Sequence, residues 1–189
     1  QIQSFENDSL SKQVATIWPE LKEQSAAKAK RIASLRTSLT KESLEKADRS
    51  AGRLLFSKSC ANCHTLFGEG KKVAPDLTGA QRSNLNYLLE NIIDPSATVS
   101  KNFKMSIVIQ NDGRIFNGVI VERTPKTYTI QTADAKIVFP KSSVDEITES
   151  NLSMMPENLL NVLDDTQIRN LIGYLMSPAQ VPLPATPSK

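Results

Sequence analysis

The chain of 189 residues contains two cysteines and one histidine, and all three fall within five consecutive positions. Cys60 and Cys63 are separated by two residues, and His64 follows directly. Two thiols at this spacing can add across the two vinyl groups of one porphyrin edge, and a histidine at the next position can bind the iron through Nε2. The motif predicts one haem c, attached covalently through Cys60 and Cys63, with His64 as an iron ligand.

Other uses of these three residues remain to be weighed. A Cys-x-x-Cys pair also occurs in redox disulfides, but no βαβ pattern surrounds this one. A zinc site needs a fourth ligand, and a carboxylate would have to supply it because the chain has no further Cys or His. His64 could also be an ordinary surface histidine, although it is the only histidine of the chain.

A histidine that binds a metal needs its second ring nitrogen held by a hydrogen bond. A backbone carbonyl about ten residues after the motif is the expected acceptor, and Ala74-Pro75-Asp76-Leu77 lies there. Pro75 offers a carbonyl oxygen and no competing amide hydrogen. Leu77 could lie against the porphyrin, so Pro75 and Leu77 join the predicted haem site.

The second axial ligand has to come from another residue type, because there is no second histidine. Methionine, water or an open position are the alternatives. Met105 and Met176 fall in a predicted strand and helix, where methionine usually fills the core. Met154 and Met155 precede Pro156, which favours extended backbone at Met155, and neighbouring side chains of extended backbone point to opposite sides. We favour Met155 over Met154 as the second iron ligand.

Two further groups near the motif have weaker roles in this interpretation. Arg82 and Tyr87 could donate hydrogen bonds to haem propionates, but a surface arginine and a helix-packing tyrosine are the plainer interpretation. The charged residues that flank the motif could steer acidic partners or could simply form a solvated face; they are Lys58, Lys71 and Lys72.

Helical patterns occur at both ends of the chain. Residues 1–48 are polar and are expected to form a helical extension in which Pro19 breaks or restarts the helix. Their apolar positions have helical spacing: Val14, Ile17, Trp18, Leu21, Ala29, Ile32, Leu35 and Leu39. Further helices are expected over 49–60, over 82–93 and around 168–175, where Asp164 and Gln167 resemble a capping box.

Between these helices the apolar period changes to alternation. Strands are expected over 105–110, 115–122, 127–132 and 136–139, with a short fifth strand over 145–148. Asn111-Asp112-Gly113 predicts a hairpin turn, and Gly118 a bulge or bend. We therefore predict a mainly α haem domain over 49–180 that contains a small antiparallel β insert over 101–149, between the two iron ligands, and an extended tail over 181–189.

Composition excludes some function classes. The charged and apolar fractions are those of a soluble globular protein. The net charge of +3 is spread along the chain and gives no dense basic footprint for nucleic acid. No apolar run approaches the roughly 20 residues of a transmembrane helix. The chain starts at Gln1 rather than Met, so a mature protein or a piece of a longer one is expected.

The haem region resembles class I cytochromes c. Gly52 and Phe56 stand before Cys60 as in the N-terminal helix of that fold, and the resemblance implies that they contact Leu171 and Tyr174 of the last helix. Ala74-Pro75-Asp76-Leu77-Thr78-Gly79 resembles the loop that orients the histidine ligand, with alanine in place of the usual first glycine.

More narrowly, residues 49–184 are similar to a haem-binding domain of planctomycetes and verrucomicrobia. The matching stretches are Cys60 to Gly70, Pro75 to Gly79, Asn91 to Ser96, Asn111 to Arg114, Met155 to Leu160 and Val181 to Pro184. In that family the methionine before the proline is retained, which supports Met155. The domain usually ends large periplasmic proteins, behind a propeller-like dehydrogenase domain.

The single motif predicts a mono-haem c-type cytochrome that transfers electrons and is not itself an enzyme. Haem c is attached outside the cytoplasm in bacteria, so a periplasmic location is expected, in agreement with the resemblance. Its redox partner would be the fused dehydrogenase domain or a separate protein. The alternative is a haem enzyme or gas sensor with a labile sixth ligand.

Overall fold

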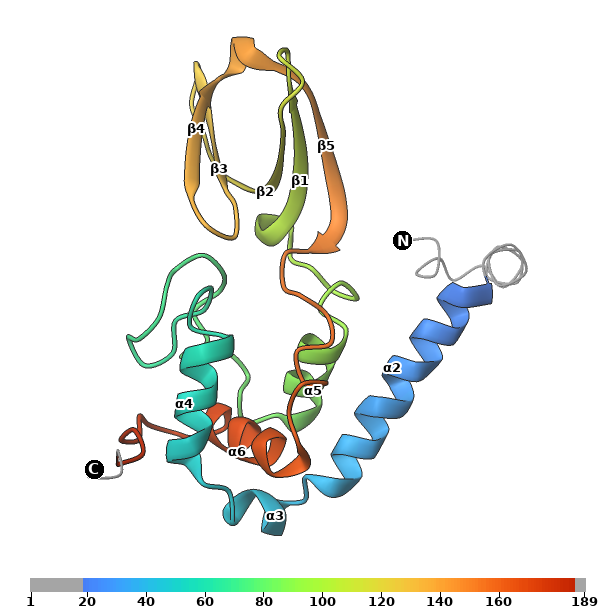
Figure 1. The fold of residues 1–189 in the computed structure, drawn as a ribbon, viewed down its shortest axis with the longest axis vertical. Helices are drawn as coiled ribbons and strands as arrows, with labels where there is room; N and C mark the ends of the chain where they lie inside the picture. Colours follow the sequence, from blue (N-terminus) through green and yellow to red (C-terminus); the bar gives the residue numbers. More distant parts are fainter. Residues whose placement is uncertain (1–18, 186–189) are drawn as a thin grey trace.

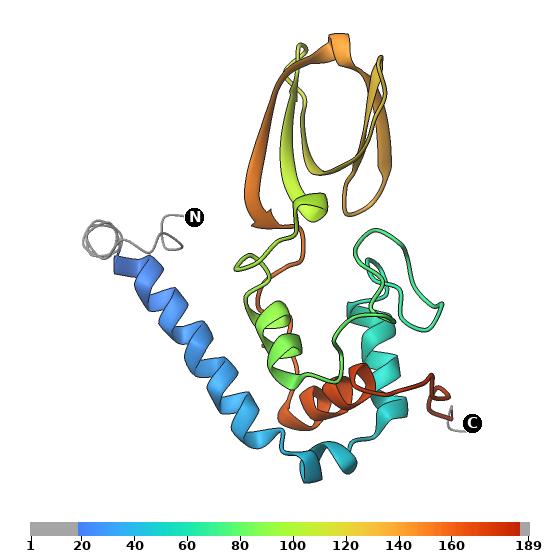
Figure 2. The same cartoon turned by 180° about the vertical axis from the view of Figure 1, so that it is seen from behind.

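The structure is a computed structural model that describes residues 19–185. Helices occupy one end of the molecule and strands the other (Figures 1 and 2). We call the helices together the helical part; they are α2 (Pro19–Ser38), α3 (Lys41–Glu45), α4 (Arg49–Ser59), α5 (Leu85–Ile93) and α6 (Asp165–Leu175). The strands lie in sequence between α5 and α6. None of the described helices is both long enough and apolar enough to cross a membrane.

One hydrophobic core joins the helices. It contains Leu35 from α2 and Leu39 just after it, Phe56 from α4, Leu88 and Leu89 from α5, and five residues of α6: Ile168, Leu171, Ile172, Tyr174 and Leu175. Of the predicted apolar positions of the extension, Ile32, Leu35 and Leu39 pack on this chain, whereas Ala29 is exposed. The predicted positions Val14, Ile17 and Trp18 lie outside the described residues.

Helices α4 and α6 cross at Gly52. A Cβ atom at Gly52 would lie 2.0 Å from the backbone oxygen of Asn170 and 2.8 Å from Cβ of Tyr174. The rings of Phe56 and Tyr174 pack with their centroids 5.7 Å apart. The expected contact with Tyr174 is confirmed, while the closest approach to Gly52 comes from Asn170, the residue before Leu171.

The helix termini follow their capping residues. The capping box of α6 is confirmed, because the Asp164 carboxylate accepts from the Gln167 amide and the Gln167 side chain accepts from the Asp164 amide. Helix α5 begins at Leu85 rather than at residue 82, because the Asn84 side chain accepts a hydrogen bond from the Tyr87 amide at 3.2 Å and caps the helix there.

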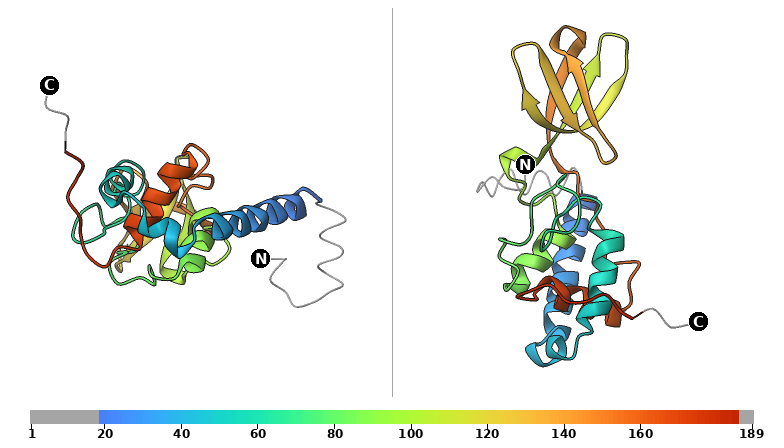
Figure 3. Two further views of the ribbon diagram at one scale, coloured as in Figure 1. Left: turned by 90° about the horizontal axis from the view of Figure 1, so that it is seen from below. Right: turned by 90° about the vertical axis from the view of Figure 1, so that its left-hand side faces the viewer.

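Five antiparallel strands form one sheet in the order β4-β3-β2-β1-β5. Figure 3 shows that the sheet is strongly curved. The strands are β1 (Lys104–Gln110), β2 (Ile115–Arg123), β3 (Thr127–Gln131), β4 (Lys136–Pro140) and β5 (Val144–Ser153). We call residues 101–153 the sheet segment. The fifth strand has 10 residues, so the prediction of a short strand over 145–148 is wrong in length.

Strand β2 changes partner at Gly118. Gly118 pairs with Ser106 of β1, and the next residue, Val119, pairs with Gln131 of β3. A Cβ atom at Gly118 would lie 2.3 Å from the Gln131 oxygen, so the close approach of β3 requires glycine. The register irregularity itself lies later, between Ile120 and Glu122. The strand therefore changes partner at Gly118, where a bend is predicted, whereas the bulge lies two to four residues later.

The sheet segment has its own small core. Its buried side chains are Val108, Ile130 and Phe139, and the Phe116 and Phe139 rings stack with centroids 6.0 Å apart. This core is separate from that of the helical part, so the sheet segment buries its apolar face against itself.

Candidate haem-binding site

The cysteine motif forms a tight turn at the end of α4. The Cys60 amide ends the helix by donating to the Phe56 oxygen at 2.8 Å. The amides of Cys63 and His64 then both donate to the Cys60 oxygen, at 3.0 and 2.9 Å. Both thiols are free and half-buried. The turn therefore brings two thiols and one imidazole to the same end of one helix.

The chain after the motif folds back beneath His64. The amides of Val73 and Ala74 donate to the Cys63 oxygen at 3.0 and 2.8 Å, and Nδ1 of His64 then lies 2.8 Å from the Pro75 oxygen. A carbonyl oxygen can only accept, so the ring hydrogen sits on Nδ1. Nε2 consequently keeps its lone pair and is the ring nitrogen that can bind a metal.

Gly70 lies directly against the backbone of His64. Its φ angle is +101°, and a Cβ atom there would lie 2.1 Å from the His64 oxygen. The turn before it is equally tight, since Phe67 has a φ angle of +52° and Leu66 bridges to Glu69. Sequence reasoning gave Gly70 no role, although a Gly-x-Gly pair just after the motif is a usable signal for such a turn.

Further hydrogen bonds hold the loop that contains Pro75, and we call residues 60–82 the motif loop. The Leu77 amide donates to the Thr65 oxygen at 2.8 Å, and the Phe67 amide donates to Oγ1 of Thr78 at 2.9 Å. The Thr78 amide donates to Asp76 at 2.8 Å and lowers the pKa of that carboxyl group. Leu77 is half-buried against the core of the helical part.

Arg82 is buried, so its interpretation as a surface residue is wrong. Only 8% of it is exposed. Its guanidinium donates to the oxygens of Leu175 and Ser177 at 2.6 and 2.8 Å and to the Thr78 oxygen at 3.2 Å. It also lies over the Phe67 ring, 4.8 Å from the centroid. Arg82 therefore ties the motif loop to the end of α6. Tyr87, in contrast, is exposed rather than packed.

Changing Arg82 to methionine is expected to lower the free energy of unfolding by about 2–4 kcal/mol, because buried carbonyl oxygens would lose a charged donor. Denaturant unfolding of the variant measures this. Arg36, exposed in the last turn of α2, provides the control, and its change to methionine is expected to cost under about 0.5 kcal/mol. Equal losses in the two variants would show that Arg82 does not tie these segments together.

The methionines considered as second ligand lie on different elements. Met105 belongs to β1, and Met176 ends α6 and packs on the core of the helical part. Met154 and Met155 follow β5 and are both half-buried. The Met155 amide donates to Oγ of Ser153 at 3.1 Å. The preference for Met155 over Met154 rests on Pro156 and on the resemblance.

We call residues 154–160 the distal loop. It runs from β5 past α5 toward the start of α6, while the motif loop lies on the other side of the helical part (Figure 1). The motif loop and the distal loop are far apart in the sequence, yet both lie below the sheet, one on each side of the helical part.

The Cys60 thiol does not have the property expected of a redox-active cysteine. Burial, and after it the charge of Cys63, raises the pKa of Cys60 to about 11, so this thiol stays protonated near neutral pH. Reactive Cys-x-x-Cys thiols have lowered pKa values instead. Within residues 19–185 no three His, Cys, Asp or Glu side chains converge on a possible metal ion, so a zinc site gains no support. Two free thiols and an imidazole with free Nε2, all in one turn at the end of α4, fit haem c.

Comparison with known proteins bears on the same region. Residues 50–108 match the sequence model of the family described as Cytochrome c. The match covers most of α4, the motif loop, α5 and most of β1, and it ends before the distal loop. A search of curated proteins gives no match. The family match supports a cytochrome c-like domain in this part of the chain, which implies covalently bound haem c and haem-based electron transfer with a redox partner.

Proposed function

We propose that this chain is a mono-haem c-type cytochrome that transfers electrons. Cys60 and Cys63 hold the haem by thioether bonds, and His64 and Met155 bind its iron. Haem c, when bound, supplies a reversible one-electron couple. The protein's part is to hold the two axial ligands in place, to set the basicity of His64 and to shield the porphyrin with side chains such as Leu77.

The hydrogen bond from His64 to Pro75 carries this proposal. It selects the ring tautomer with Nε2 free and fixes the plane of the ring. The motif loop supports Pro75 through the bonds of Leu77 to Thr65 and of Phe67 to Thr78. An unattached surface histidine needs no such support, whereas a metal ligand gains both orientation and basicity from it.

A methionine thioether as the second ligand changes the midpoint potential of the haem iron. Sulfur from methionine favours the ferrous state, so His–Met ligation gives a higher midpoint potential than ligation by two histidines. Pro156 favours extended backbone at Met155, which separates the directions of the Met154 and Met155 side chains. A midpoint potential on the positive side of the haem range is therefore expected.

We further propose that residues 49–180 are the haem domain, that the β insert expected over 101–149 and extended here to Ser153 lies within it, and that residues 1–48 are an extension. The chain would be the C-terminal module of a larger periplasmic protein, reduced by a fused dehydrogenase-like domain. The resemblance supports this, as does the attachment of haem c outside the cytoplasm in bacteria. The exposed Lys58, Lys71 and Lys72 beside the motif suit an acidic redox partner.

Covalent attachment is the first property to test. In the chain expressed with haem c maturation machinery, mass spectrometry is expected to show the mass of one haem added, and acid–acetone is expected to leave the pigment on the protein. Changing both Cys60 and Cys63 to alanine should make any pigment extractable. A colourless protein that contains zinc, or a red protein that loses its pigment to acid–acetone, would contradict the proposal.

A further inference from the structure

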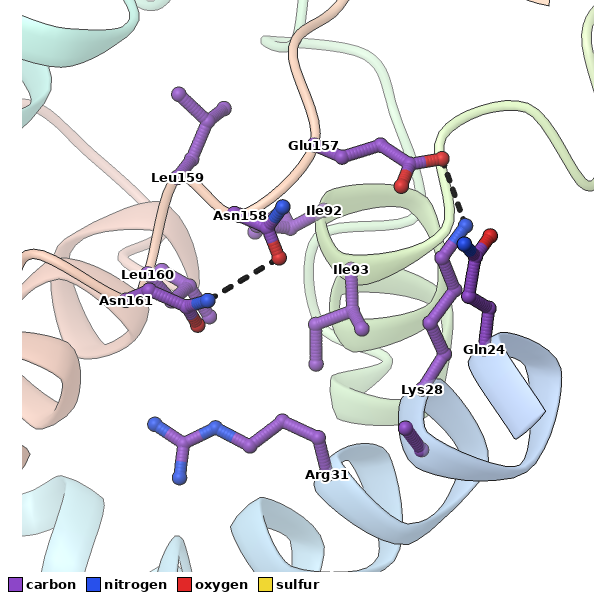
Figure 4. Close-up of a pocket in the computed structure, with 11 residues that line it drawn as sticks. Gln24, Lys28, Arg31, Ile92, Ile93, Glu157, Asn158, Leu159, Leu160 and Asn161 are labelled. Atoms are coloured by element: carbon purple, nitrogen blue, oxygen red, sulfur yellow. Dashed lines mark hydrogen bonds and ion pairs between the residues drawn. The ribbon is translucent and has the colours of Figure 1, made fainter. Parts of the chain in front are cut away.

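One lysine of α2 bridges the two chain segments that connect the sheet segment to the helical part. Nζ of Lys28 lies 2.8 Å from Oδ1 of Asp94 and 2.6 Å from Oε1 of Glu157. Asp94 ends α5, just before the chain leaves for the sheet. Glu157 lies in the returning distal loop, two residues after Met155. Figure 4 shows the Lys28 and Glu157 side chains meeting at the upper edge of a cavity.

That cavity lies under the distal loop. It has a volume of about 480 Å³ and is lined by α2, α5 and residues 157–161. Its walls include Arg31, Ile93 and Asn161, and none of the residues of the cysteine motif (Figure 4). A segment that rests on a cavity has few packing contacts from below. Three contacts hold the distal loop: the Ser153 amide donates to Oγ of Ser96 at 3.2 Å just before the loop, Lys28 pairs with Glu157 in its middle, and Leu160 is buried at its end.

The Lys28 pairs are less solvated than ordinary surface pairs. The side chain of Lys28 is 24% exposed, against 30% for Asp94 and 41% for Glu157. Burial alone would lower the pKa of Lys28, but its bonds to the two carboxylates outweigh burial and raise the pKa overall. The ammonium group therefore stays charged, and partial burial leaves both pairs less screened by salt than exposed pairs.

We propose that Lys28 is a positioning residue that holds the distal loop and so keeps Met155 on the iron. This rests on the proposed ligation by Met155. Helix α2 lies outside the region that matches the cytochrome c family, so the inference gives this helix a role that the haem domain alone does not provide. Any event that separates α2 from Asp94 and Glu157 would make the sixth position of the iron easier to reach.

The test uses the holoprotein with Lys28→Gln. Imidazole competes with a methionine ligand for ferric iron, so its apparent affinity measures how firmly Met155 is held. Loss of a partly buried double ion pair is expected to raise that affinity about fivefold to tenfold. Amide hydrogen exchange at Met155 is expected to speed up, whereas covalent haem content stays unchanged. Lys28→Arg is expected to restore the original imidazole affinity.

Lys46→Gln is the matched control. Lys46 pairs with Glu42 at 2.7 Å, and both side chains are largely exposed, at 69% and 78%. This variant removes the same charge and should leave imidazole affinity unchanged. Glu157→Gln is expected to act in the same direction as Lys28→Gln, and the double variant should show less than the sum of the two effects.

The outcomes separate the inference from the proposed function. If the unmodified protein lacks the weak far-red band of an iron–methionine bond, ligation by Met155 is wrong and the role of Lys28 is overturned with it. If the band is present and Lys28→Gln changes neither imidazole affinity nor exchange at Met155, only the role of Lys28 is overturned. A change of equal size in Lys46→Gln would overturn it as well.

Discussion

Changing Met155 to alanine in the holoprotein is expected to abolish the weak far-red band of the ferric form and to lower the midpoint potential by roughly 0.1 V or more, a modest part of the about 0.8 V that axial ligands span. The thioether stabilises Fe(II), and in the variant water or an open position takes its place, so this stabilisation is lost. Optical redox titration measures both effects. The ferrous variant should also bind CO faster than the unmodified protein, because the sixth position is free.

Met154→Ala is the control, since it removes a methionine of the same loop with the same half-buried side chain. It should keep the band and the midpoint potential of the unmodified protein. If Met154→Ala lost the band and Met155→Ala kept it, Met154 would be the ligand. If the unmodified protein had no band and bound CO rapidly, the alternative of a haem enzyme or gas sensor would replace electron transfer.

Features encoded within a few residues could be predicted from the sequence. The capping box at Asp164 and the turn at Gly113 depend only on neighbours along the chain, and the structure has both. The sequence also predicts the carbonyl of Pro75 as the partner of His64, because proline leaves no competing donor at that position, and the structure shows this contact. The roles of these residues toward haem remain predictions.

Features that join distant residues could not be predicted in the same way. Arg82 bonds to Leu175 and Ser177, which are 93 and 95 residues away, and no local pattern distinguishes it from an exposed arginine. The pair of Lys28 with Glu157 spans 129 residues. The contacts of Arg82, which hold the motif loop, and of Lys28, which hold the distal loop, thus arise only from tertiary packing.

Strand β5 shows a different limit. Its ten residues pair along the whole of β1, from Gln110 with Val144 to Lys104 with Ser153. None of them is fully buried, so the alternation of apolar and polar residues that reveals a strand is weak. Backbone pairing with β1 extends the strand where side-chain burial leaves little trace in the sequence.

Changing Gly52 to alanine is expected to lower the free energy of unfolding by about 2–4 kcal/mol, although alanine is favoured over glycine by about 1 kcal/mol inside a helix. The new Cβ atom would lie 2.0 Å from the backbone oxygen of Asn170, and a backbone atom cannot swing aside as a long side chain can. Asn170 is also held from its side chain, which accepts from the Asp48 amide at 3.0 Å. Denaturant unfolding of the variant measures the loss.

Gly79→Ala is the matched control, because no atom lies within 4 Å of a Cβ atom built there. It should change the free energy of unfolding by less than about 0.5 kcal/mol. Since α4 ends at Cys60, a forced shift of α4 against α6 also displaces the thiols, so Gly52→Ala should reduce the yield of covalently attached haem as well as stability. Equal unfolding midpoints and equal haem content in the two variants would mean that the α4–α6 crossing has room for a methyl group and does not position the motif.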